Sequence, residues 1–157
     1  MMDETDIKIL EMLQKNARST ASEIGATIGM SVSAVIERIK KLENNGVIEE
    51  YTTILNHKNV KKDVTAFVNI SLEHPKYNDQ FLQFVQSCGD ILECHYLAGD
   101  FDYLLKVITD STTTLEQLLR SIKCTAGVVR TYTSLVLTTE KCAHSVPPSG
   151  ITGALRT

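Results

Sequence analysis

Apolar residues recur every three or four positions in the first third of the chain, which is the period of an amphipathic helix. The first helix is predicted over residues 3–16, with Asp3 at its N-cap and acidic residues in its first turn, where they suit the helix dipole. Its apolar side is predicted to consist of Ile7, Leu10 and Leu13, flanked by Ile9 and Met12. The chain is therefore expected to begin with a helix that buries one side against a neighbour.

Two further helices are predicted from the residues that begin and end them. Thr20 and Glu23 form a capping box, and Gly29 stands where a helix ends in the left-handed conformation. Ser31 can cap a third helix, which Gly46 would close. The apolar positions are Ile24 and Ile28 in the second helix and Val35, Ile39 and Leu42 in the third, with Ile36 beside them. The three-residue link between these helices has the length of the turn in a helix-turn-helix.

The third helix carries the residues that we expect to contact DNA. If its apolar stripe packs inward, short polar side chains near its start and cations further along are left on its outer surface. Short side chains let a helix enter the major groove, Arg38 can donate two hydrogen bonds to a guanine edge, and lysines can reach phosphates. The candidate DNA contacts are Ser31, Ser33, Ala34, Glu37, Arg38, Lys40 and Lys41. For this helix alone, the alternative is a plain helical hairpin with a solvated charged face.

After residue 64 the helical period gives way to an alternating one, and Ala66, Val68, Ile70 and Leu72 share a face, as is typical of a half-buried strand. Residues 47–55 are a short β-prone stretch, and the polar residues 56–63 are interpreted as a hinge. Beyond the hinge, strands are predicted over residues 65–72, 91–98, 101–109 and 128–138, and helices over residues 77–87 and around Leu115, Leu118, Leu119 and Ile122. The order β-α-β-β-α-β predicts a ferredoxin-like domain, with an antiparallel sheet and both helices on one face.

The predicted fold class is thus α+β, with two domains and two connecting or terminal segments. Residues 1–55 form the DNA-binding domain, residues 56–63 the hinge and residues 64–140 the ferredoxin-like domain. Residues 141–157 form a tail without periodicity, which is expected to be flexible or used in association.

The turn Ala98–Tyr103 is the candidate site for a small ligand. An amino acid needs N–H or hydroxyl groups for its carboxylate and an anion or carbonyl for its ammonium. Gly99 would let the backbone approach a ligand closely, and Asp100 and Asp102 offer carboxylates. Thr131 and Thr133 are two residues apart on one strand, so their hydroxyls are expected to point the same way. An ordinary acidic hairpin turn is the alternative.

The charge distribution does not by itself indicate a nucleic-acid partner. The chain has a formal net charge of −3. Residues 1–62 contain nine basic and nine acidic side chains, so any DNA contact must come from local clustering.

The chain shows no signal for a membrane, for secretion or for an enzyme. It has no apolar run long enough to span a bilayer and its first residues are acidic, so a cytoplasmic protein is expected. Phosphate-binding, zinc-hydrolase and serine-hydrolase motifs are absent, so neither catalysis nor a cofactor or metal is expected. The four cysteines form no CxxC pair and are expected to be reduced, semi-buried thiols.

Three segments of the chain resemble the Lrp/AsnC, or feast/famine, transcription regulators. These are residues 6–25, which include Asp6–Leu10, Asn16–Arg18 and Glu23–Gly25; residues 29–48; and residues 99–131, which include Gly99–Val107 and Gly127–Thr131. The resemblance covers about residues 3–140, with the segments in the family's order and spacing.

The resemblance implies a winged helix-turn-helix joined to a ferredoxin-like regulatory domain. It further implies dimers formed by pairing of two regulatory sheets, larger assemblies that are commonly octamers, and amino acid effectors bound near the Gly99–Tyr103 loop. The implied effector contacts are Gly99, Asp100, Phe101, Asp102 and Tyr103, with Thr131 and Thr133. Two positions depart from the family pattern: Ala98 stands where a hydroxyl residue is frequent, and Glu49 and Glu50 make the wing region acidic.

The function predicted from the sequence is a DNA-binding regulator that senses an amino acid and controls genes of amino acid metabolism or transport. One alternative is an architectural DNA-binding protein that needs no ligand. Another is a redox or metal sensor that uses Cys88, Cys94 and His95.

Overall fold

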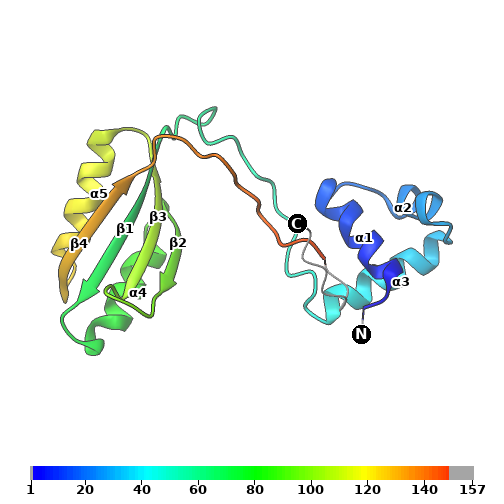
Figure 1. Ribbon diagram of the computed structural model, residues 1–157, viewed down its shortest axis with the longest axis horizontal. Coiled ribbons are helices and arrows are strands. Elements are labelled where there is room, and N and C mark those ends of the chain that lie inside the picture. The colour runs from blue at the N-terminus through cyan, green and yellow to red at the C-terminus, as the bar shows by residue number, and fades with distance from the viewer. Residues whose placement is uncertain (1, 149–157) are drawn as a thin grey trace. The chain divides into compact units, whose positions relative to one another are not determined.

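The computed structural model describes residues 2–148, which form two compact units (Figure 1). The first unit runs to Thr53 and includes the tail from Lys141, and the second runs from Ile54 to Glu140. Residues 149–157 of the predicted tail lie outside the described residues.

Three helices make up the first unit: α1 (Glu4–Lys15), α2 (Ala21–Ile28) and α3 (Val32–Asn44). The predicted caps are confirmed, because Thr20 and Glu23 bond reciprocally and Ser31 accepts the backbone N–H of Ala34. Gly29 closes α2 with φ of +74°, a conformation that costs a residue with a Cβ more than it costs glycine. A second capping box, which the sequence pattern did not predict, joins Asp3 and Asp6 at the start of α1.

The close approach of α2 to the turn that follows it depends on Gly25. A Cβ built on Gly25 would lie 2.6 Å from the carbonyl oxygen of Met30, a backbone atom that cannot simply swing away. The helix-turn-helix link therefore requires a glycine within α2 as well as the one that ends it.

The core of the first unit combines all three helices. Its buried side chains are Ile9, Leu10 and Leu13 from α1, Ile24 from α2, and Val35 and Leu42 from α3, with Ile28 and Ile39 packed against them. Leu10 and Leu13 are buried as predicted, but Ile7 is only half-buried, and Ile9, which was predicted to flank the apolar side, is fully buried. The buried face of α1 also includes Asp6, a charged residue that hydropathy assigns to the surface.

Residues 47–55 form no strand, although their composition is β-prone. A strand needs a neighbouring strand for its backbone hydrogen bonds, and residues 2–53 contain no other strand. Instead, the N–H groups of Val47 and Ile48 donate to the carbonyl oxygen of Leu42. The hydroxyl of Tyr51 donates to Glu43 at 3.0 Å, and burial together with that carboxylate raises the pKa of Tyr51 to about 12.

The second unit has the predicted βαββαβ order. Its elements are β1 (Val64–Leu72), a short 3₁₀ helix η1 (Pro75–Tyr77), α4 (Asn78–Ser87), β2 (Ile91–Tyr96), β3 (Tyr103–Thr109), α5 (Thr112–Cys124) and β4 (Val128–Leu135). All strand pairs are antiparallel, and the sheet order is β2-β3-β1-β4. Figure 1 shows α4 and α5 on the same side of the sheet, as expected for a ferredoxin-like fold.

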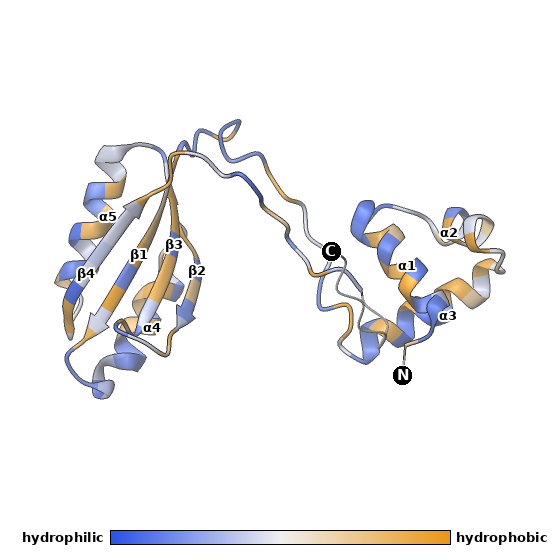
Figure 2. Cartoon of the chain, viewed as in Figure 1, coloured by the Kyte–Doolittle hydropathy of each residue, from blue (hydrophilic) through white to orange (hydrophobic). Residues whose placement is uncertain are grey.

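The core of this unit lies between the sheet and the two helices. Alternate residues of the central strands are buried, namely Ala66, Val68 and Ile70 of β1 and Tyr103, Leu105 and Val107 of β3. They pack against Phe81 and Val85 of α4 and Leu115, Leu118 and Ile122 of α5. Burial alternates from residue to residue along β3 and through the middle of β1. In Figure 2 hydrophobic residues predominate along both strands.

Three predicted strand ends were too long, because other hydrogen bonds replace the ladder there. β2 ends at Tyr96 and β3 begins at Tyr103, so residues 97–102 form a loop instead of a two-residue turn. Within this loop Leu97 N–H donates to the carbonyl of Asp102, and Asp102 N–H donates to the carbonyl of Ile70. At the other end of the sheet β4 stops at Leu135, and one further bond joins Val136 N–H to the carbonyl of Thr65.

The polar residues predicted as a hinge form an ordered turn of the second unit. Asn56 accepts hydrogen bonds from Lys58 N–H and Asn59 N–H through its side-chain oxygen. The Nζ atom of Lys62 lies 2.8 Å from Asp90 and 2.7 Å from Asp110, so the end of the turn is tied to the sheet.

Candidate DNA-binding and ligand-binding sites

Helix α3 presents most of the predicted DNA contacts on its outer surface. Ser31, Ser33, Glu37, Lys40 and Lys41 are exposed and Ala34 is half-buried, while Val35 and Leu42 on the opposite side are buried. The hydroxyls of Ser31 and Ser33 lie 3.2 Å apart at the N-terminal end of the helix, where free N–H groups favour an anion. This division between a packed side and a polar side is what a recognition helix needs.

Arg38 is the exception among the predicted contacts. Its Nη1 atom lies 2.7 Å from Asp3 Oδ2 and 2.7 Å from Asp6 Oδ1, so the guanidinium joins α3 to the start of α1. The Asp6 side chain is only 8% exposed, which makes this pair part of the packing of the unit. These two bonds raise the pKa of Arg38, and the backbone N–H of Asp6 together with the Arg38 guanidinium lowers the pKa of Asp3. Its role in reading a base stays a prediction.

Two apolar side chains on the outer part of α3 were not among the predicted contacts. Val32 is 46% exposed and Ile36 is 41% exposed, one turn apart on the helix. From the sequence, Ile36 was expected beside the core stripe. Exposed aliphatic groups next to polar ones are suited to contact the methyl group of thymine in the major groove. The signal in the sequence was their position at the edge of the stripe, where helical spacing alone does not separate core from surface.

The loop between β2 and β3 combines residues with different roles. Gly99 and Asp100 are exposed, and a Cβ added to Gly99 would meet nothing within 4 Å. Asp102 is half-buried, and its Oδ2 atom accepts the backbone N–H of Leu72 at 2.7 Å, where the pairing of β1 with β4 shifts register. Asp102 therefore stabilises the loop, and Asp100 is the carboxylate of this loop that is open to solvent.

Phe101 contacts two side chains of β4. The guanidinium of Arg130 lies over the Phe101 ring, 4.6 Å from its centroid, and the ring of Tyr132 lies 6.5 Å from that of Phe101. A cation–π contact of this kind holds an exposed guanidinium in place. Arg130 was not among the predicted ligand contacts, because its position next to Phe101 depends on strands that are far apart in the sequence.

Tyr103 lies in the core, although the resemblance implied a ligand contact there. It is 4% exposed, and its ring centroid lies 5.0 Å from that of Phe81 and 5.3 Å from that of Tyr96. Burial is the largest cause that raises the pKa of Tyr103. The alternation of β3 places every second residue from Tyr103 toward the helices, so this side chain packs instead of facing solvent.

Thr131 and Thr133 point to the same side of β4, as predicted. They pair with Ile70 and Val68, which face the helices, and both threonines are half-buried. Arg130 and Tyr132 alternate with them and face the other side of the sheet. Within one chain, the two threonines therefore lie on the opposite side of the sheet from Arg130 and Tyr132, the side chains that contact Phe101.

Of the three residues in the redox or metal alternative, Cys88 and Cys94 both pack against the core of the second unit, and His95 lies apart from them. Cys94 pairs with Leu105 on the helix side of the sheet, whereas His95 is exposed, with Nε2 3.2 Å from Glu93. Burial raises the pKa of the Cys94 thiol. Within residues 2–148, no group of three or more histidine, cysteine or acidic side chains is placed to hold a metal ion. None of the described helices is both long and apolar enough to cross a bilayer.

Both units match known protein families. Residues 2–49 match the winged helix-turn-helix DNA-binding family, and residues 65–146 match the Lrp/AsnC ligand binding domain. The chain is 36% identical over 146 residues to the glutamate uptake regulatory protein of Zymomonas mobilis, covering 92% of this chain and 88% of that protein. It is 35% identical over 139 residues to the leucine-responsive regulatory protein of Escherichia coli, covering 87% and 85%.

Solved structures agree with this relationship. A transcriptional regulator of Neisseria meningitidis in complex with L-methionine superimposes with a TM-score of 0.89 at 30% identity, covering 94% of this chain and 97% of that one. AsnC of Escherichia coli superimposes with a TM-score of 0.87 at 26% identity, covering 94% and 99%.

The fold and the exposed α3 surface therefore define a DNA-binding transcription regulator with a ligand-binding domain, and not an enzyme. The chain belongs to the Lrp/AsnC family of transcriptional regulators.

Proposed function

We propose that this regulator responds to a free amino acid and controls genes of amino acid metabolism or transport. The names of three relatives support an amino acid effector, since they refer to glutamate uptake, to leucine response and to a complex with L-methionine. The exposed Asp100 beside the unobstructed Gly99 supports the loop as the place where an ammonium group would bind.

The observation that carries DNA recognition is the division of α3 into a buried stripe and an exposed polar side. On this proposal Ser33 and Ile36 enter the major groove, while Lys40 and Lys41 neutralise phosphates. The acidic pair Glu49 and Glu50 is exposed and contributes no cation to the interface.

Selection from random-sequence duplexes, followed by gel shifts over a range of salt concentrations, tests this interface and does not require the operator sequence. Lys40→Ala with Lys41→Ala should weaken binding to all sequences and reduce the salt slope by about 2, one unit for each lost phosphate contact. Ile36→Ala should instead change the selected sequence. An unchanged salt slope in the double variant would show that α3 does not face the duplex.

The effector response needs its own measurement. Thermal melting of the full chain with each of the twenty L-amino acids identifies a ligand, because a molecule that binds only the folded state raises the melting temperature by mass action. The same ligand should then change the affinity for the selected duplex. If none of the twenty amino acids raises the melting temperature, the architectural alternative is favoured, in which DNA binding needs no ligand.

We also propose that the protein works in the cytoplasm as a homodimer that assembles further, as far as an octamer. The side of the sheet opposite the helices supports a dimer, because it carries aromatic and aliphatic side chains that no element of the second unit covers. These are Phe67, Leu104, Ile108 and Tyr132, of which Tyr132 is 59% exposed. Light scattering of wild-type protein and of Tyr132→Glu tests this interface, and loss of the dimer is expected in the variant.

A further inference from the structure

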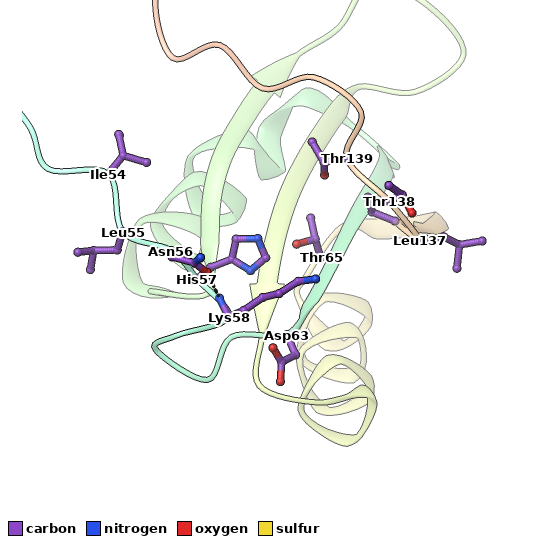
Figure 3. A pocket seen from close by; sticks show the side chains of 11 residues that line it. Ile54, Leu55, Asn56, His57, Lys58, Asp63, Thr65, Leu137, Thr138 and Thr139 are labelled. Atoms are coloured by element: carbon purple, nitrogen blue, oxygen red, sulfur yellow. Dashed lines mark hydrogen bonds between the residues drawn. The ribbon is translucent and has the colours of Figure 1, made fainter. Parts of the chain in front are cut away.

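A cavity of about 610 Å³ lies at the end of the sheet where β1 begins, as Figure 3 shows from close by. Its volume falls within the range of small-molecule sites in proteins. One wall is the segment 54–58 together with Asp63, and the other is the segment 136–139, with Thr65 between them. All of these residues belong to the second unit.

This cavity is separate from the loop discussed above. In the register of β1 with β3, Val64 pairs with Thr109 and Ile70 pairs with Tyr103. The cavity therefore lies near the beginning of β1, and the Gly99–Tyr103 loop lies near the end of β1. A ligand in one place does not occupy the other.

The lining carries one cation and one anion that the rest of the unit does not use. Within residues 2–148, neither Lys58 nor Asp63 makes an ion pair, and no oxygen of Asp63 lies within 4 Å of the Lys58 nitrogen. Lys62 in the same turn differs, because Asp90 and Asp110 already neutralise it. Lys58 and Asp63 are exposed and line the cavity, whereas Lys61 of the same turn is also exposed and does not line it.

The wall that carries these charges is ordered. His57 Nδ1 lies 2.6 Å from the carbonyl oxygen of Lys62, and Lys62 N–H donates back to the carbonyl of His57 at 2.8 Å. Since a carbonyl only accepts, Nδ1 must carry the proton, and Nε2 of the neutral ring is left as an acceptor. The cavity therefore offers a cation, an anion, an imidazole acceptor and the hydroxyls of threonines, namely Thr65, Thr138 and Thr139.

We propose that this cavity is a second ligand site, which binds a small zwitterion of the α-amino acid class. Lys58 binds the carboxylate, Asp63 and His57 bind the ammonium, and the threonine hydroxyls complete the hydrogen bonds. A simple anion would leave Asp63 unpaired beside it, and a simple cation would leave Lys58 unpaired. A molecule with both charges satisfies both side chains.

The walls of the cavity give the site a means of regulation. Segment 54–58 directly follows Thr53, where the first unit ends, and segment 136–139 leads toward Lys141, where that unit resumes. A ligand held by Lys58 on one wall and by a threonine of the other restrains both connections to the DNA-binding unit. Occupancy of the cavity is therefore expected to alter DNA affinity.

Fluorescence of the full-length chain tests the proposal. The chain contains no tryptophan, and Leu137 lines the cavity while being 91% exposed, so Leu137→Trp adds a single reporter without disturbing the core. Each of the twenty L-amino acids is titrated in turn. We expect at least one to shift the emission, and the affinity to fall at least about tenfold when Lys58→Gln and Asp63→Asn are added.

Two control variants separate this site from its surroundings and from the loop. Lys61→Gln removes a charge of the same turn that does not line the cavity, and Asp100→Asn changes the loop at the other end of β1. Both should leave the titration unchanged. The proposal is overturned if no L-amino acid shifts the emission, if Lys61→Gln weakens binding as much as the double variant, or if Asp100→Asn abolishes the signal. The proposed loop site is judged separately, by melting of Asp100→Asn without the reporter.

Discussion

The guanidinium of Arg38 lies 2.7 Å from the carboxylate of Asp6, a side chain that is almost completely buried at the start of α1. Arg38→Ala would leave this carboxylate without its cation, at a cost of about 1–3 kcal/mol in the free energy of unfolding of the first unit. Urea unfolding followed by circular dichroism measures the change. Arg18→Ala, at an exposed arginine of the same unit, is the matched control and should have almost no effect.

The other ion pair of Arg38, with Asp3, implies a loss of stability in acid. The pKa of Asp3 is lowered from its ordinary value of 3.8, mainly by the backbone N–H of Asp6 and the side chain of Arg38. As the pH falls, the unfolded chain therefore binds the proton first. The stabilisation is complete above the ordinary carboxyl pKa and is lost as the pH falls through the lowered value. When the free energy of unfolding is measured as a function of pH, the loss in acid should be smaller for Arg38→Ala than for the wild type.

Substitutions at Asp102 and Asp100 should have different effects, the first on the stability of the loop and the second on ligand binding. Asp102→Ala removes the acceptor of the Leu72 N–H, so we expect a loss of about 1–3 kcal/mol in stability together with any loss of effector response. Asp100→Asn removes only an exposed charge and should leave the melting temperature of the free protein unchanged. Calorimetric titration with the identified effector should show weaker binding to Asp100→Asn. Equal affinity of this variant and the wild type would remove Asp100 from the site.

Two glycines near this end of the sheet should respond oppositely to alanine. Gly127 has φ of +84°, and a Cβ there would collide with the side chain of Tyr77. Gly127→Ala should therefore unfold the second unit at a clearly lower temperature or prevent its folding. Gly99→Ala has free space around the new methyl group and should melt like the wild type. If Gly99→Ala nevertheless abolishes the effector response, close approach of a ligand to the loop backbone is the remaining explanation.

The cysteines should differ in reactivity. Burial raises the pKa of Cys94, so less of it is thiolate at any given pH, and thiolate is the form that reacts. Cys124 and Cys142 are exposed. A disulfide reagent at neutral pH should modify these two quickly and Cys94 only slowly, with the Cys94 rate rising as the pH is increased. Rapid modification of Cys94 in the native protein would revive the redox alternative.

Much of the fold and part of the candidate site could be read from the chain alone. Thr20 with Glu23, Ser31 and Gly29 act on backbone groups within a few residues of themselves, so the limits of α2 and α3 are local properties. The alternation along β1 is equally local, and it predicted a half-buried strand there. The two-residue spacing of Thr131 and Thr133 predicted that they share a side of β4.

What the sequence could not decide is which partner each of these side chains meets. Arg38 pairs with residues 32 and 35 positions earlier, and Asp102 accepts from a residue 30 positions earlier, so both contacts exist only after the helices and strands have packed. Alternation shows that two residues lie on one side of a strand. Only the placement of α4 and α5 decides that this side is the buried one, because burial depends on what covers a face and not on the strand itself.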